Sequence, residues 1–180
     1  MHERNGLLDA TGLPGSATMT RIDRTLPRIV LDTNVCLDLF VFRDPMCSHL
    51  LAAMQSGAVQ AVTRDDCREE WHRVLHYPQL PIDDQLCPGI SAAFDALIQL
   101  LPAEASMVGE GDISLPRCGD PDDQKFLELA LASGARWLLS KDNELLKLDR
   151  RTRSAGLFSI RLPQLWSIAD ARSHRASEPG

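Results

Sequence analysis

The chain has 180 residues and a formal net charge of −6, with a pI of about 5.3. Hydrophobic residues make up 44% and charged residues 24%, which is typical of a single globular domain with a sizeable core. The chain holds no run near the ~20 apolar residues of a membrane helix and no signal-peptide core, so we expect a cytoplasmic protein. The acidity argues against a binder of nucleic acids through a general basic surface, but not against a nuclease that holds metal ions on clustered acids.

Five cysteines are scattered along the chain without a C-x-x-C pair. An odd number at irregular spacing argues against a disulfide framework and against a structural zinc site. The nearest pairs of zinc-ligand type are Cys47 with His49 and Cys67 with His72, and neither suggests four convergent ligands. Reduced cysteines that serve mainly in packing fit a cytoplasmic location.

The first clear element is the apolar run 29–31, which predicts a buried strand of a parallel sheet. Residues 1–27 are polar and Gly-containing, so we expect a flexible leader, followed by one domain over 28–172 and a flexible tail over 173–180. Asp32 follows the strand directly and therefore lies at the rim where open α/β sheets bind ligands. Asp is also common as a helix N-cap, and that role competes with a chemical one.

Strands and helices alternate along the rest of the domain. The pattern predicts further strands at 59–62, 136–140 and 157–160, and helices at 35–42, 47–55, 64–77, 90–101, 120–134, 144–148 and 163–171, with Thr63 as the cap of the third helix. A short strand is also expected near 105–108. Such alternation predicts a three-layer α/β/α sandwich with a mainly parallel central sheet.

Three more acids come at comparable places. Asp142 follows the predicted strand 136–140, as Asp32 follows the first one. Asp123 is the inward-facing acid at the start of the helix 120–134, whereas Asp120 has the position of an N-cap. Glu70 flanks the buried stripe of its helix, and Glu69 points further toward solvent.

Each of these acids alone has an ordinary explanation as a cap or a solvated helix residue. Together, four carboxylates on one rim would repel one another unless a divalent cation neutralised them. Oxygen ligands without Cys or His suit Mg²⁺, with Mn²⁺ as the alternative.

The order of these motifs resembles the PIN-domain family. The motifs are I-V-L-D-T-N-V, E-E-W-H-R-V-L-H-Y-P, D-P-D-D-Q-K-F-L-E-L-A-L-A-S-G-A and W-L-L-S-K-D-N-E-L-L, and they cover roughly residues 28–163. The likeness is greatest to the branch of toxin components of toxin–antitoxin pairs. It implies a PIN-like α/β/α fold and a metal-dependent ribonuclease that hydrolyses RNA phosphodiesters.

The resemblance also implies site residues. Its four acids fall on Asp32, Glu70, Asp123 and Asp142, as catalytic residues and as metal ligands. The third falls on Asp123 because the family's acid lies seven residues before an alanine of the same helix, here Ala130. Supporting polar positions fall on Asn34 and on Ser140, where the family frequently has Thr. The implied ion would lower the pKa of a water aimed at phosphorus.

The implied partners are an RNA substrate, an antitoxin protein and a second copy of the chain in a homo-oligomer, expected to be a dimer. Apolar surface near 35–41 or around Leu50 is a candidate for the dimer contact, unless both segments are simply core. Candidate cations for RNA docking are Arg43, Lys125, Lys141 and the run 150–153, which otherwise reads as a solvated loop.

Two alternatives remain open. One is a non-catalytic PIN-like module that binds RNA or protein, in which the acids are structural. The other is a phosphatase of the haloacid type with Asp32 as nucleophile, although that class usually has a second Asp where this chain has Asn34.

Overall fold

A computed structural model of the protein describes residues 26–103 and 114–169. Most of the expected leader 1–27, the expected tail 173–180 and the expected strand near 105–108 lie outside the described residues. Within the described part, no helix is both long and apolar enough to cross a membrane.

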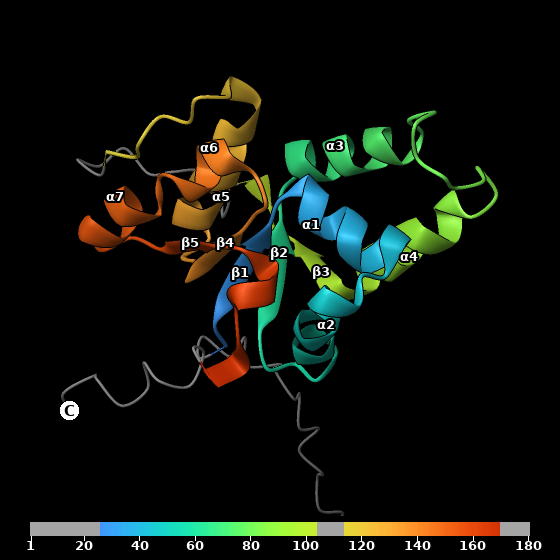
Figure 1. Ribbon diagram of the computed structural model, residues 1–180, viewed down its shortest axis with the longest axis horizontal. Helices are drawn as coiled ribbons and strands as arrows, with labels where there is room; N and C mark the ends of the chain where they lie inside the picture. The colour runs from blue at the N-terminus through green and yellow to red at the C-terminus, as the bar shows by residue number, and fades with distance from the viewer. Residues whose placement is uncertain (1–25, 104–113, 170–180) are drawn as a thin grey trace, which may run out of the picture.

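Five parallel strands form one central sheet in the order β3-β2-β1-β4-β5 (Figure 1). The strands are β1 (Arg28–Leu31), β2 (Gln60–Thr63), β3 (Ile98–Leu100), β4 (Trp137–Leu139) and β5 (Ser159–Arg161). β1 lies in the middle, where Val30 is in register with Val62 of β2 and with Leu138 of β4. Because both faces of this strand are covered, its side chains form the continuous apolar run seen in the sequence.

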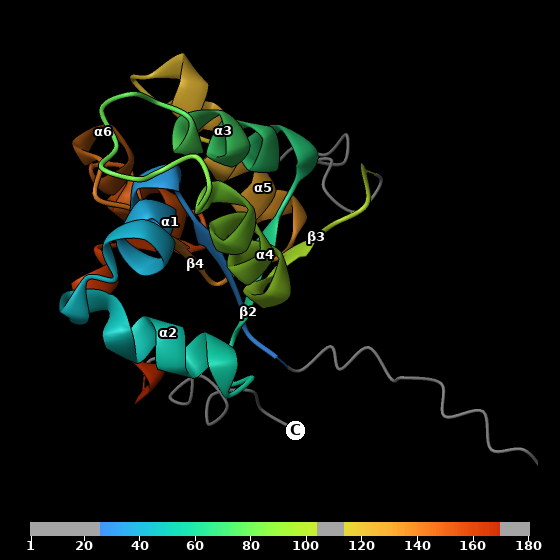
Figure 2. The same ribbon diagram turned by 90° about the vertical axis from the view of Figure 1, so that its right-hand side faces the viewer.

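Helices cover both faces of the sheet, so the three-layer α/β/α sandwich is confirmed. One layer contains α1 (Thr33–Leu37), a π-helical turn (Asp38–Phe42), a 3₁₀ turn (Pro45–Cys47), α2 (Ser48–Gln55), α3 (Asp65–Leu75) and α4 (Cys87–Leu97). The other contains a 3₁₀ turn (Pro121–Asp123) that leads into α5 (Gln124–Ala132), then α6 (Asn143–Leu146) and α7 (Asp149–Ser154). Figure 1 shows the two layers on opposite sides of the strands, and Figure 2 looks onto the layer with α1, α2 and α4.

The core is divided in the same way. Ile29 and Leu31 of β1 pack with the buried side chains of α1 to α4, whereas Val30 packs with those of α5 and α6. Alternate residues of one strand thus anchor the two helical layers.

Several element predictions need correction. The expected helix 90–101 begins at Cys87 and ends at Leu97, and the next three residues form β3. Ile98 pairs with Ala61 of β2, and this tertiary contact overrides a helical spacing of apolar residues. Thr63 belongs to β2, and Arg64 precedes α3 without a side-chain cap.

Two further elements differ near the end of the chain. The basic run 150–153, considered for RNA docking or otherwise as a solvated loop, lies in the short helix α7. The expected helix 163–171 begins with a 3₁₀ turn over Pro163–Leu165, and residues beyond 169 lie outside the described part.

Candidate active site

Asp32 lies at the carboxyl end of the central strand and is 2% exposed. It is the N-cap of α1, since its Oδ1 accepts a hydrogen bond from the Val35 amide at 2.8 Å. Its Oδ2 accepts a hydrogen bond from the Ser140 hydroxyl. Burial raises the pKa of Asp32 to about 6, although these two hydrogen bonds oppose the shift.

Ser140 connects Asp32 with Asp142. It follows β4 directly, is 0% exposed, and accepts a hydrogen bond on Oγ from the Asp142 amide at 2.9 Å. Asp142 is the N-cap of α6, where its Oδ1 accepts from the amides of Glu144 at 2.6 Å and Leu145 at 3.3 Å. Two strand–helix junctions are therefore joined through one buried hydroxyl.

Asp123 ends the 3₁₀ turn that leads into α5 and is half-buried. Burial, and then the negative charges of Asp142, Asp120 and Glu70, raise the pKa of Asp123 to about 6. Asp123 in turn raises the pKa of Asp32, so these acids are close enough to repel one another. Asp120 is exposed and caps the turn, accepting from the Asp122 amide at 2.9 Å.

Glu70 is held by two side chains from other elements. Its Oε1 accepts a hydrogen bond from the Thr33 hydroxyl, and its Oε2 pairs with the Lys125 ammonium group. Glu69 is exposed, as its position on the helix predicted. The sequence reasoning missed Thr33 in this role and assigned Lys125 to RNA docking instead. Thr33 lies inside D-T-N and Lys125 two residues after Asp123, but neither neighbourhood reveals a contact with Glu70 across the fold.

An open pocket of about 300 Å³ lies in front of these residues. Asp32, Glu70 and Asp123 line it, together with Asn34, whose side chain is exposed. The rest of the wall is Thr33, Leu37, Val74, Tyr77, Gln79, Leu80 and Phe126. Asp142 and Ser140 are not among the lining residues, so three of the four acids share the wall, while Asp142 is near enough to raise the pKa of Asp123.

Comparison with known protein families identifies the fold that carries these acids. A family model described as the PIN domain matches residues 28–144, a segment that runs from β1 into α6 and includes all four acids. The chain belongs to the PIN-domain family. No curated protein matches it. Among solved structures, it is similar to the crystal structure of VapBC2 from Rickettsia felis bound to a DNA fragment from their promoter, with 10% identity, a TM-score of 0.47, and coverage of 74% of this chain and 96% of that chain.

PIN domains are generally nucleases that use divalent metal, and the pocket has the donors for such an ion. Its wall carries three carboxylates, and the ammonium group of Lys125 pairs with that of Glu70. Burial raises the pKa values of Asp32 and Asp123, and the negative charges of neighbouring acids add to the shift. An all-oxygen donor set of this kind fits Mg²⁺ or Mn²⁺.

Compact groups of metal-binding type occur elsewhere in the described part of this PIN domain. The ligand atoms of Asp38, Asp44 and Cys47 lie within 4.8 Å of one another, and so do those of His76, Asp84 and Cys87. Neither group includes any of the four acids.

The apolar segments considered for a dimer contact are mostly internal. Val35 and Leu50 are 0% exposed, so they belong to the core of one PIN domain. Phe42 and Met46 remain exposed nearby. Of the cations considered for RNA, Lys141 pairs with Asp38 at 2.8 Å.

Proposed function

We propose that this PIN domain is a metal-dependent endoribonuclease that hydrolyses RNA phosphodiesters with Mg²⁺, or alternatively Mn²⁺. One observation carries the proposal. The buried carboxylate of Asp32 faces the same open pocket as Glu70 and Asp123, and its pKa is raised by burial and by the charge of Asp123. Several carboxylates at the carboxyl ends of the strands suit a divalent cation, and a bound cation can in turn bind a phosphate.

The four acids take different parts in this proposal. Asp32, Asp123 and Asp142 hold the ion, and Glu70 either contributes a ligand or accepts the proton of the attacking water. Ser140 fixes the orientation of Asp32, and Thr33 and Lys125 fix that of Glu70. Asn34 lies on the pocket wall, where its amide can orient water or phosphate. When bound, the ion supplies activation of water and neutralisation of phosphate charge.

The remaining wall of the pocket suits an unpaired nucleotide. Tyr77 is 44% exposed and lies in the wall with Leu80 and Phe126. Exposed aromatic rings stack on bases that are not in a duplex, and such stacking is independent of sequence. We therefore propose single-stranded or looped RNA as the substrate.

The biological setting is also a proposal. The motif resemblance supports a toxin that is held inactive by an antitoxin protein, and a homodimer as the active form. All five cysteines are free, which fits a reducing compartment, so we propose the cytoplasm as its location.

Cleavage of a looped RNA in Mg²⁺ tests the activity. Asp32→Asn, Glu70→Gln, Asp123→Asn and Asp142→Asn should each lower the rate on the order of 1000-fold, since loss of several kcal/mol of charge stabilisation has that effect. Glu69→Gln and Asp122→Asn are matched controls, because both acids are exposed neighbours of proposed ligands. They should change the rate less than about threefold.

Two results would distinguish a nuclease from a non-catalytic binding module. Full cleavage by Asp32→Asn in a nuclease-free preparation would contradict the proposal. RNA binding without cleavage by the wild type, and unaffected by Asp32→Asn, would favour the non-catalytic binding module.

A further inference from the structure

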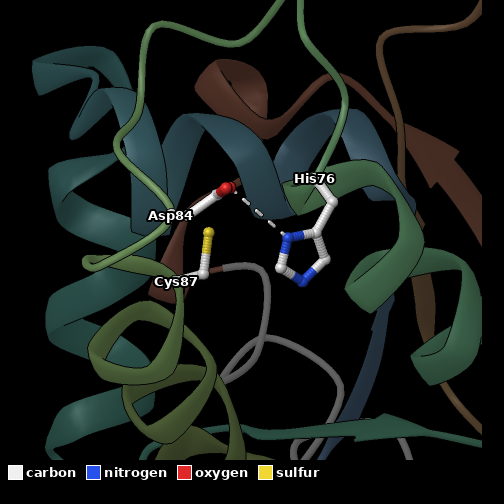
Figure 3. Close-up of side chains that lie close together, drawn as sticks. All are labelled: His76, Asp84 and Cys87. Carbon is white, nitrogen blue, oxygen red and sulfur yellow. Dashed lines mark ion pairs between the residues drawn. The ribbon is translucent and has the colours of Figure 1, made fainter.

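A second group of potential ligands lies where α3 ends and α4 begins. His76 is the first residue after α3, Cys87 is the first residue of α4, and Asp84 lies in the connecting segment. Figure 3 shows the imidazole, carboxylate and thiol of these residues pointing toward a common centre. Their spacing, H-x₇-D-x₂-C, contains no C-x-x-C pair, and the sequence analysis predicts no metal site here.

The distances are close to those of a coordination site. One nitrogen, one oxygen and one sulfur lie within 4.8 Å of one another, and His76 Nδ1 is 3.6 Å from Asp84 Oδ1. Zinc bonds of about 2.1 Å to nitrogen and oxygen at tetrahedral angles put these two atoms about 3.4 Å apart. The side chains of His76 and Asp84 are 63% and 88% exposed, so both can close the small remaining gap.

We propose that His76, Asp84 and Cys87 form a separate binding site for Zn²⁺ or a similar borderline-soft divalent ion, with water as the fourth ligand. One sulfur and one imidazole nitrogen are the donors that distinguish such ions from Mg²⁺. Cys87 is 4% exposed, and its thiol donates weakly to the carbonyls of Leu75 and Asp83. On binding, the thiol proton passes to solvent and the thiolate becomes a ligand.

The other compact group does not carry the same proposal. Asp38, Asp44 and Cys47 also lie within 4.8 Å of one another. However, Lys141 Nζ contacts both carboxylate oxygens of Asp38, at 3.1 and 2.8 Å, and so already supplies a positive charge. Within the group of His76, Asp84 and Cys87, the positive charge comes from His76 alone, and only when its ring is protonated.

The proposed zinc site lies next to the acidic pocket along the chain, so metal binding there would affect the pocket wall. The segment 77–86 joins its ligands, and Tyr77, Gln79 and Leu80 of this segment line the acidic pocket. A metal bridge from His76 to Cys87 would tie both ends of the segment together. Zinc at this site therefore orders one wall of the pocket without being a ligand for the substrate.

Cobalt(II) is the first probe, because a thiolate bound to it gives a charge-transfer absorption that zinc then removes by displacement. The wild type should bind one Co²⁺ with this absorption, and excess Mg²⁺ should leave it unchanged. Asp32→Asn should bind Co²⁺ in the same way, which separates this site from the acidic pocket. Cys118→Ser and His72→Ala are controls outside the group and should keep the absorption.

Cys87→Ser should abolish the thiolate absorption. Because Cys87 is buried, His76→Ala at an exposed position provides a second variant that leaves the packing intact; it should weaken binding on the order of 100-fold. In the wild type, Zn²⁺ should slow hydrogen exchange in segment 77–86. No thiolate absorption in the wild type, its persistence in Cys87→Ser, or its loss in Cys47→Ser instead would overturn the proposal, whether or not the protein cleaves RNA.

Discussion

At the residue scale, Asp32 is a helix cap that also lines the pocket, whereas the sequence presented capping and a chemical role as alternatives. One carboxylate oxygen caps α1 and the other accepts from Ser140, while the group still lies on the wall of the pocket. A cap role therefore gives no argument against a chemical role. The cap and the position on the pocket wall follow from the same fact, that the central strand ends where a helix begins.

The burial of Asp32 predicts the pH dependence of stability in the absence of metal. The pKa of Asp32 is about 6 in the folded protein, whereas the ordinary value for an aspartate, which we take for the unfolded chain, is 3.8. Between these two pH values the folded protein holds a proton on Asp32 that the unfolded chain has lost. The free energy of unfolding should fall as pH rises through this window, and Asp123 acts in the same direction.

Asp32→Asn should remove much of this slope and stabilise the metal-free protein by about 1–3 kcal/mol near pH 7.5. Urea unfolding with a chelator at about pH 4.5 and pH 7.5 measures it. If the variant were less stable than the wild type at pH 7.5, the charged form of Asp32 would not destabilise the folded protein, and the prediction would be wrong.

At the element scale, helix starts position three of the acids. Asp32 is the N-cap of α1 and Asp142 is the N-cap of α6, and Asp123 ends the 3₁₀ turn that Asp120 caps directly before α5. Helix N-termini carry partial positive charge, which favours carboxylates at these points. The backbone at these helix starts thus partly stabilises the carboxylates in the absence of a bound ion.

Asp120 offers a test that separates capping from metal binding. Asp120→Ala should lower the free energy of unfolding by about 1 kcal/mol, because the Asp122 amide loses its acceptor. Asp120→Asn keeps the cap and should restore that stability. Calorimetric Mg²⁺ affinity should change less than about threefold in both variants, and a far larger loss in Asp120→Asn would make Asp120 a ligand.

At the scale of the whole molecule, an ion that binds only the folded chain must stabilise it. At a Mg²⁺ concentration 100 times the dissociation constant, the gain is about 2.7 kcal/mol, which corresponds to a rise of roughly 5–10 °C in Tm for a chain of this size. Chelation should reverse the rise. The proposed acidic site predicts no such rise in Asp32→Asn, and an equal rise there would place the ion elsewhere.

The local sequence determined two strands of the sheet and the candidate acids of this protein. The apolar runs 29–31 and 137–139 marked two strands of the sheet, and the acids after them marked the rim, because strand ends and helix caps are set by neighbouring residues. Helical spacing also distinguished Glu70 from Glu69. Strand ends, helix caps and helical spacing depend on residues that are close in the chain, so a local pattern of residues can predict them.

Only the tertiary structure decided which side chains meet. Thr33 and Lys125 contact Glu70 across 37 and 55 positions of the chain. β3 exists because Ile98 pairs with β2. The group of His76, Asp84 and Cys87 forms where α3 and α4 meet, since Trp71 of α3 stacks on Phe94 of α4. Such contacts depend on the packing of distant segments, and no local pattern of residues encodes them.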